Sequence, residues 1–198
     1  QEGHMTKGRL EAFSDGVLAI IITIMVLELK VPHEPTFEAL GELGPVFVSY
    51  VLSFVLIGTY WNNHHHMLQA AKVINGRALW ANLLLLFWLS LFPFATSWMG
   101  ENDFAAVPTA IYGVVQVLAA VSYTVLAQVL VRVPGQPPAL AEELGRDIKG
   151  RLSLASYLVA IPVALVAPLV GLAIYFGVVA LWFVPDRRME RVIGRGDG

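Results

Sequence analysis

Long apolar segments alternate with short polar ones along the chain, and this pattern predicts helices that cross a membrane. A helix needs roughly 20 residues to span the hydrocarbon core of a bilayer. Polar and helix-ending residues, among them Pro32, Pro35 and Gly76, separate the apolar segments. The pattern predicts an all-α, polytopic membrane protein with six transmembrane helices, at residues 10–30, 45–67, 78–99, 105–131, 151–167 and 170–185.

The division between the fifth and sixth helices is the least marked in this pattern. Residues 152–184 form one apolar stretch that is interrupted by Pro162, Pro168 and Gly171. A single helix of that length would overshoot the bilayer. Two short helices joined by a tight turn near residues 167–171 therefore fit the stretch better.

The composition is typical of a membrane protein. Of the 198 residues, 57% are hydrophobic and 14% are charged, and the mean hydropathy is +0.66. Soluble domains carry about a quarter charged residues. The sequence contains no cysteine, which excludes disulfides and thiolate metal sites.

The basic residues predict the orientation in the membrane. Six spans place both termini on one side, together with the connections at residues 68–77 and 132–151. Of the 13 Lys and Arg residues, Lys30 alone falls on the other side, which leaves 12 on the side of the termini. Basic residues accumulate on the cytoplasmic side, so both termini are expected there. The expected organisation is an N-terminal tail with a vector-derived remnant (1–8), a membrane domain (9–186) and a basic cytoplasmic tail (187–198).

The first apolar segment has one face of branched apolar side chains with a single hydroxyl among them. At 100° per residue, Ile20, Thr23 and Leu27 fall on one stripe, with Ile24 beside it. An ordinary packed or lipid-facing helix can show such a stripe. An ordinary helix is the commoner source of this pattern, but a helix that lines a pore shared by several copies of the chain also fits, because apolar rings close pores by dewetting and hydroxyl rings replace part of an ion's water shell. The periodicity leaves both interpretations open.

Polar residues gather where the first two spans meet the predicted cytoplasmic side. Ionisable groups at the start of a membrane helix are costly and need partners. Since the first helix runs outward and the second runs back, Ser14 and Asp15 are expected at the depth of the Trp61 indole and can accept hydrogen bonds there. Such a network would fix the pose of the first helix. The predicted inter-helix network comprises Arg9, Phe13, Ser14, Asp15, Trp61, Asn62, Asn63, His64, His65, His66 and Asn82.

The three consecutive histidines, His64, His65 and His66, also raise the question of a metal site. Neighbouring residues on a helix point about 100° apart, so the three cannot ligate one ion. Helical metal sites use residues three or four positions apart, and no Asp or Glu in the second span supplies such a ligand. We expect no metal site, no cofactor and no enzymatic activity.

Two motifs of the first two helices resemble those of a known family. The first is Arg9-x-x-x-Phe13-Ser14-Asp15, followed by Gly16-Val-Leu-Ala-Ile20 and Thr23, and the second is Trp61-Asn-Asn-His-His-His66. They are similar to the bacterial branch of the transmembrane protein 175 family, which comprises potassium channels.

The resemblance implies an architecture and a set of pore residues. It implies a homotetramer of six-helix subunits in the bacterial inner (plasma) membrane, with the first helices around a central pore. The carbonyl-lined filter of ordinary potassium channels is absent from this family. By position, the resemblance implies that Ile20 forms the narrowest apolar ring and that Thr23 forms a hydroxyl ring passed by potassium ions. Ile24 and Leu27 would continue the pathway outward.

The predicted function is a potassium-selective leak channel in which a hydrophobic constriction replaces the carbonyl filter. Its expected partners are potassium ions, further copies of the chain and the lipid bilayer, with no role for nucleic acid. The alternative is a small proton-linked transporter that uses Asp15 and the three histidines as a relay. A membrane-bound metalloenzyme is a third interpretation. The lack of an internal repeat and the poor metal-ligand spacing count against these two.

Overall fold

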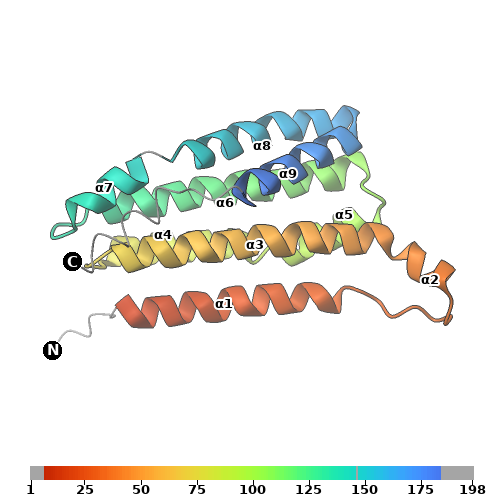
Figure 1. Ribbon diagram of the computed structural model, residues 1–198, viewed down its shortest axis with the longest axis horizontal. Coiled ribbons are helices and arrows are strands. Elements are labelled where there is room, and N and C mark those ends of the chain that lie inside the picture. Colours follow the sequence, from red (N-terminus) through yellow and green to blue (C-terminus); the bar gives the residue numbers. More distant parts are fainter. Residues whose placement is uncertain (1–6, 146, 184–198) are drawn as a thin grey trace.

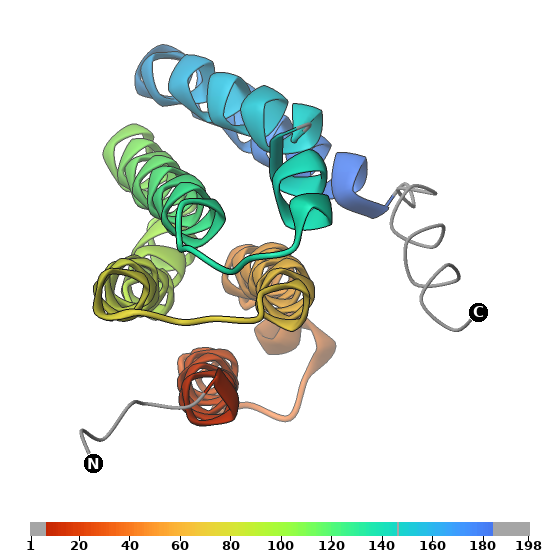
Figure 2. The same ribbon diagram turned by 90° about the vertical axis from the view of Figure 1, so that its left-hand side faces the viewer.

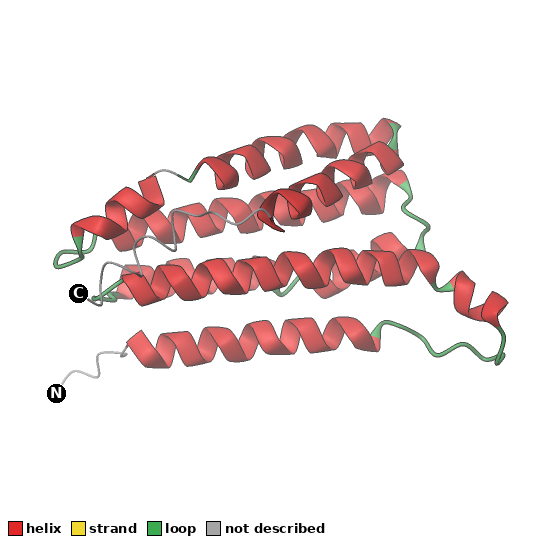
Figure 3. Cartoon of the chain, in the orientation of Figure 1, coloured by secondary structure: helices red, strands yellow, loops and turns green. Residues whose placement is uncertain are grey.

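The computed structural model describes residues 7–145 and 147–183, and all regular structure in these two stretches is helical (Figure 3). The all-α prediction is therefore confirmed for the described residues. The predicted tails lie almost entirely outside them. The helices are α1 (Lys7–Leu27), α2 (Phe37–Glu42), α3 (Gly44–Ala70), α4 (Gly76–Leu89), α5 (Phe92–Glu101), α6 (Ala106–Val131), α7 (Pro138–Gly145), α8 (Ile148–Val166) and α9 (Pro168–Phe183).

Five helical segments in the described part are long and apolar enough to cross a membrane. They are α1, α3, the α4–α5 pair over Gly76–Glu101, α6 and α8. These segments make the chain a multi-pass membrane protein. The helix α9 has 16 residues, fewer than the roughly 20 that a full span takes. It is apolar and packs along α8, and the sixth span stays a prediction.

The helices form one bundle in which α1 occupies one edge and the α8–α9 pair occupies the opposite edge (Figure 1, Figure 2). The helix α1 packs against α3, α4 and α5, whereas α8 packs against α6 and α9. The helix α3 contacts both sides, since it touches α1 and α9. The arrangement leaves α1 covered by its own subunit on one side.

The two ends of the bundle differ in charge. The start of α1, the α3–α4 connection and α7 lie at one end, and α2 and the α8–α9 turn lie at the other (Figure 1). At the second end, Lys30 Nζ donates a hydrogen bond of 2.7 Å to Glu101 Oε1. This bond and the charge of the carboxylate raise the pKa of Lys30. The other described basic residues belong to the first end: Lys7, Arg9, Lys72, Arg77, Arg132, Lys149 and Arg151.

The third predicted span, residues 78–99, differs from the structure because it consists of two helices. The helix α4 ends at Leu89, and α5 begins three residues later. Pro93 has no N–H to offer the Leu89 carbonyl, and its ring would clash with that carbonyl. The Leu91 N–H instead bonds to the Trp88 oxygen at 3.2 Å, three residues back. The chain therefore turns briefly between α4 and α5.

The fifth and sixth predicted helices are two separate helices, and Ala167 alone lies between them. Pro162 lies inside α8 without ending it. Just after the turn, a Cβ added to Gly171 would lie 2.7 Å from the Ala164 Cβ and 2.9 Å from the Ala164 Cα. Gly171 thus permits the close contact between α8 and α9.

We expect Gly171→Ala to lower the free energy of unfolding by about 1–3 kcal/mol, the usual cost of overpacking. The backbone of Ala164 cannot move aside unless α8 shifts. Gly177→Ala is the matched control on the same helix, because a Cβ there meets nothing within 4 Å. Alanine favours a helix over glycine, so the control should be neutral or stabilising. Thermal unfolding in detergent measures both variants, and equal melting temperatures would contradict the close contact.

Two short helices that the sequence analysis did not predict lie in the connections. The Thr36 Oγ1 accepts the Ala39 N–H at 3.2 Å and so begins α2. The helix α7 begins at Pro138, whose fixed φ suits the first turn of a helix. Neither helix is long enough to cross a membrane.

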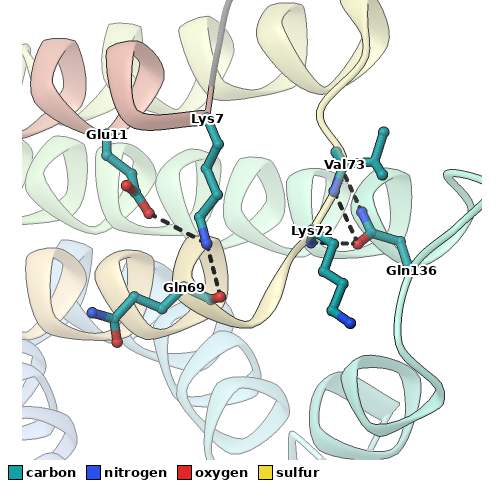
Figure 4. A network of polar contacts seen from close by, with 6 residues as sticks. All are labelled: Lys7, Glu11, Gln69, Lys72, Val73 and Gln136. Atoms are coloured by element: carbon teal, nitrogen blue, oxygen red, sulfur yellow. Dashed lines mark hydrogen bonds and ion pairs between the residues drawn. The ribbon is translucent and has the colours of Figure 1, made fainter.

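Hydrogen bonds from side chains hold the α3–α4 and α6–α7 connections at the α7 end of the bundle (Figure 4). The Gln136 Oε1 accepts the Lys72 N–H at 2.8 Å, and the Gln136 Nε2 donates to the Val73 oxygen at 2.8 Å. The Lys7 Nζ donates to the Gln69 oxygen at 2.8 Å. These bonds give the backbone after α3 its partners. They also tie the start of α1 and the connection after α6 to the end of α3.

Candidate pore-lining face and its supporting network

One face of α1 is buried against the rest of the chain. Its residues recur every three or four positions, as expected for a helix that packs on one side. They contact α3, α4 and α5, and none is more than 4% exposed. The residues of this face are Leu10, Ser14, Leu18, Ile21 and Met25.

The opposite face of α1 is open. The exposed fractions are 59% for Ile20, 41% for Ile24 and 77% for Leu27, and Thr23 is exposed as well. These four residues are the predicted pore-lining set, and all of them point away from the core of their own subunit. In a membrane such a face meets lipid or another protein surface.

The Thr23 side chain has a defined orientation on this open face. Its Oγ1 lies 2.9 Å from the Ala19 oxygen and 3.0 Å from the Ile20 oxygen, and it donates its proton to these backbone carbonyls. The hydroxyl proton is thereby bonded to the backbone of α1 itself. The lone pairs of Oγ1 stay available to a cation on the open side of α1.

A buried chain of hydrogen bonds fixes the back of α1. The Asn82 Nδ2 donates to the Ser14 Oγ at 2.9 Å, and the Asn82 Oδ1 lies 2.7 Å from the His64 Nε2. With the amide oriented in this way, Oδ1 accepts a proton carried by Nε2. Ser14 and Asn82 are fully buried, and His64 is almost so. Residues of α1, α3 and α4 thus share one polar network in the interior, where each would be costly without its partner.

A second contact lies nearer the surface. The Trp61 Nε1 donates to the Asp15 Oδ1 at 3.0 Å. The ring of His65 stacks on Trp61 with centroids 5.8 Å apart, and His66 lies against His65. Asp15 therefore has an indole partner at the border between the buried and the open face of α1.

Several predicted network residues lie elsewhere. Arg9, Phe13 and Asn62 are exposed and make no hydrogen bond to the network in the described part of the chain. The backbone oxygen of Asn63 accepts the Tyr123 hydroxyl at 3.2 Å, so this residue faces α6. Among the described residues, no three His, Asp or Glu side chains lie close enough together to hold a metal ion.

A cluster of buried hydroxyls was missed by the sequence analysis. The Ser53 Oγ lies 2.6 Å from the Thr96 Oγ1 and 2.9 Å from the Tyr112 Oη. The Thr96 hydroxyl also reaches the Met25 Sδ at 4.0 Å on the back of α1. The cluster joins α3, α5 and α6 behind the half of α1 that carries Thr23. The hydroxyl residues inside otherwise apolar segments were the feature of the sequence that could have indicated this cluster.

The first half of the chain matches a known protein family. Residues 9–93 match the profile of a family described as "Endosomal/lysosomal potassium channel TMEM175". A protein of Chryseobacterium sp. named as a potassium channel is 48% identical over 187 residues, which cover 94% of this chain and 97% of that protein. The chain belongs to the TMEM175 family. The family predicted from the motifs is confirmed, and its description as a channel agrees with the expectation of a non-enzyme.

Two further relatives of this TMEM175 protein match very different shares of the chain. The crystal structure of a protein from Chamaesiphon minutus, described as a lysosomal potassium-selective channel TMEM175 homolog, superposes with a TM-score of 0.79 at 27% identity. The match covers 90% of this chain and 96% of that one. A Gallus gallus protein named endosomal/lysosomal proton channel TMEM175 is 41% identical over 75 residues, which are 32% of this chain and 15% of that protein.

Proposed function

We propose that this TMEM175 protein is a potassium-selective leak channel of the bacterial inner membrane. Four copies would place the open face of α1 around a common axis, with Ile20 at the narrowest ring. The observation that carries the proposal is the two-sided α1, whose back is bonded through Ser14 and whose front exposes Ile20, Thr23 and Leu27. The relatives named as potassium channels support the choice of ion.

In this arrangement the residues on the open face have separate roles. A ring of Ile20 side chains excludes water unless the pore is wide enough to hydrate. A ring of Thr23 oxygens would replace part of the water shell of a potassium ion, since each proton is bonded back to the helix. The basic end of the bundle would face the cytoplasm, as positively charged loops do.

Ion flux tests the selectivity. We expect purified protein in liposomes to pass potassium well ahead of sodium, because the proposed constriction requires partial dehydration, which costs more for the smaller ion. The measurement is the uptake of each ion under the same gradient, with protein-free liposomes as the control. Equal rates for the two ions would contradict a selective pore.

Cross-linking tests the shared axis, and the lack of cysteine among the 198 residues makes the test direct. We expect Leu27→Cys to form disulfide-linked dimers on mild oxidation, since the 77% exposed side chain would face its neighbours around the axis. Val121→Cys, on an exposed position of α6, is the control and should stay monomeric on a denaturing gel. Cross-linking of neither variant, or of both to the same extent, would speak against the axis.

The proton-linked transporter is less well supported by the contacts. The Asp15 carboxylate bonds to Trp61, and His64 bonds to Asn82, so the proposed relay members use other partners. A flux that saturates with substrate and requires a pH gradient would favour the transporter over the channel.

A further inference from the structure

A cavity lies on the side of α3 that faces away from α1. It is lined by α3, α6, the first turns of α8 and the end of α9, and it opens to the outside of the bundle. The helix α1 lies at the opposite edge of the bundle from α8 and α9 (Figure 2), and its exposed residues point away from the rest of the chain. The cavity is therefore separate from the proposed ion pathway.

Small residues keep the cavity open. Ala120, Gly150 and Ser153 are small residues of its lining, and a Cβ added at Gly150 would meet the Asp147 carboxylate. The helix α9 is also short, and its Trp182 Nε1 donates to the Ser153 Oγ at 3.0 Å, so that the indole forms part of the wall. The space is bounded by a defined polar contact.

Four of the twelve described lining residues are aromatic. Tyr60, Tyr123, Tyr157 and Trp182 line the cavity. The rings of Tyr60 and Tyr123 meet edge to face, with centroids 6.2 Å apart and an interplanar angle of 67°. Aromatic rings attract ammonium groups through their quadrupoles. The chain itself uses this attraction here, because the Lys149 Nζ lies 5.7 Å from the centroid of the Trp182 ring.

A carboxylate supplies the negative charge of the cavity. The Asp147 side chain lines it, and its Oδ1 accepts the Gly150 N–H at 2.7 Å at the start of α8. A Cβ on Gly150 would lie 2.7 Å from the Asp147 Cγ, so glycine is needed for this position of the carboxylate. No Lys, Arg or His is among the described lining residues. Asp147 is thus the one charged side chain among the described lining residues, and a bound cation would compete with the Lys149 ammonium for the Trp182 ring.

We propose that this cavity binds a small organic ammonium group, held by the Asp147 carboxylate and the surrounding aromatic rings. Aromatic rings with a nearby carboxylate are the arrangement by which proteins bind alkylammonium groups. Divalent cations prefer several carboxylate oxygens, whereas Asp147 is the one carboxylate among the described lining residues. The group can come from a soluble amine or from the head group of an ethanolamine lipid, since the cavity lies at the basic end of the bundle, where lipid head groups meet the protein.

Binding measurements with two probes distinguish these sources. Ethanolamine and tetramethylammonium are titrated into the detergent-purified protein and followed by calorimetry. Retention of phosphatidylethanolamine against phosphatidylglycerol is followed by native mass spectrometry. Binding of the soluble amines supports a soluble ligand, and selective retention of phosphatidylethanolamine supports a lipid head group. Absence of both would overturn the proposal, and neither measurement depends on ion flux.

Matched variants test the site itself. Asp147→Asn keeps a helix-capping side chain but removes the charge, and it should weaken binding about tenfold, which corresponds to about 1.4 kcal/mol. Gly150→Ala displaces the carboxylate without removing it and should weaken binding as well. Asp103→Asn makes the same charge change at the other end of the bundle and should bind as the natural protein does. If Asp147→Asn bound like Asp103→Asn, with both variants folded by their melting temperatures, the proposal would be wrong.

Discussion

Replacing Ile20 with asparagine is expected to raise the potassium leak of liposomes by about tenfold or more. A tenfold change in rate corresponds to a barrier lower by about 1.4 kcal/mol. The amide holds water where the apolar side chain excludes it, and a ring of four such changes would hydrate the constriction. Since Ile20 is 59% exposed in its own subunit, the substitution should leave folding unchanged.

Two controls separate hydration of the pore from general damage to the membrane. Ile20→Leu keeps an apolar ring and should preserve the low leak. Val121→Asn places the same amide on an exposed position of α6, away from α1, and should also leak little. Potassium uptake into liposomes with equal amounts of each protein measures all three. A leak from Ile20→Asn no greater than that of the natural protein would exclude Ile20 as the constriction.

Replacing Asn82 with leucine is expected to have the largest effect on stability. Leucine has a similar size but leaves the Ser14 Oγ and the His64 Nε2 without the partners they have at 2.9 Å and 2.7 Å. Hydrogen bonds between membrane helices contribute about 0.6 kcal/mol each on average, and a buried group left without a partner costs about 1–3 kcal/mol. We expect a loss of about 2–3 kcal/mol in the free energy of unfolding.

Unfolding by denaturant in mixed micelles measures this loss. Asn62→Leu, an exposed position on α3, is the matched control and should change stability by no more than about 0.5 kcal/mol. Ser14→Ala, alone and combined with Asn82→Leu, completes a double-mutant cycle. The two losses should be less than additive, because each substitution removes the same bond. Simple additivity would show that the network does not act as a unit.

The two faces of α1 show which features of the site can be predicted from the sequence. A rotation of 100° per residue placed Ile20, Thr23 and Leu27 on one stripe, and all three are exposed. Periodicity orders side chains around a helix, but it does not reveal what lies opposite them. The set of side chains on this stripe could therefore be predicted, whereas the surface that the stripe faces could not.

Contacts between helices were harder to predict, because they depend on tilt and on axial register. The common depth of Trp61 and Asp15 followed from the direction of two neighbouring spans. The meeting of Ser53, Thr96 and Tyr112 requires three helices in register, and no rule of sequence spacing supplies it. Pro93 and Pro162 both lie inside predicted spans, yet the chain turns only at the first, and we have no physical account of why α8 continues through the second.

The turn between α4 and α5 has a mechanical consequence for the helix that they both support. Asn82 on α4 holds α1 near its beginning, and Thr96 on α5 touches it near its end. These two contacts come from two separate helices and not from one continuous helix. A displacement at one end of α1 is therefore not transmitted to the other end through α4 and α5, which leaves α3 as the one continuous helix that supports α1 among the described residues.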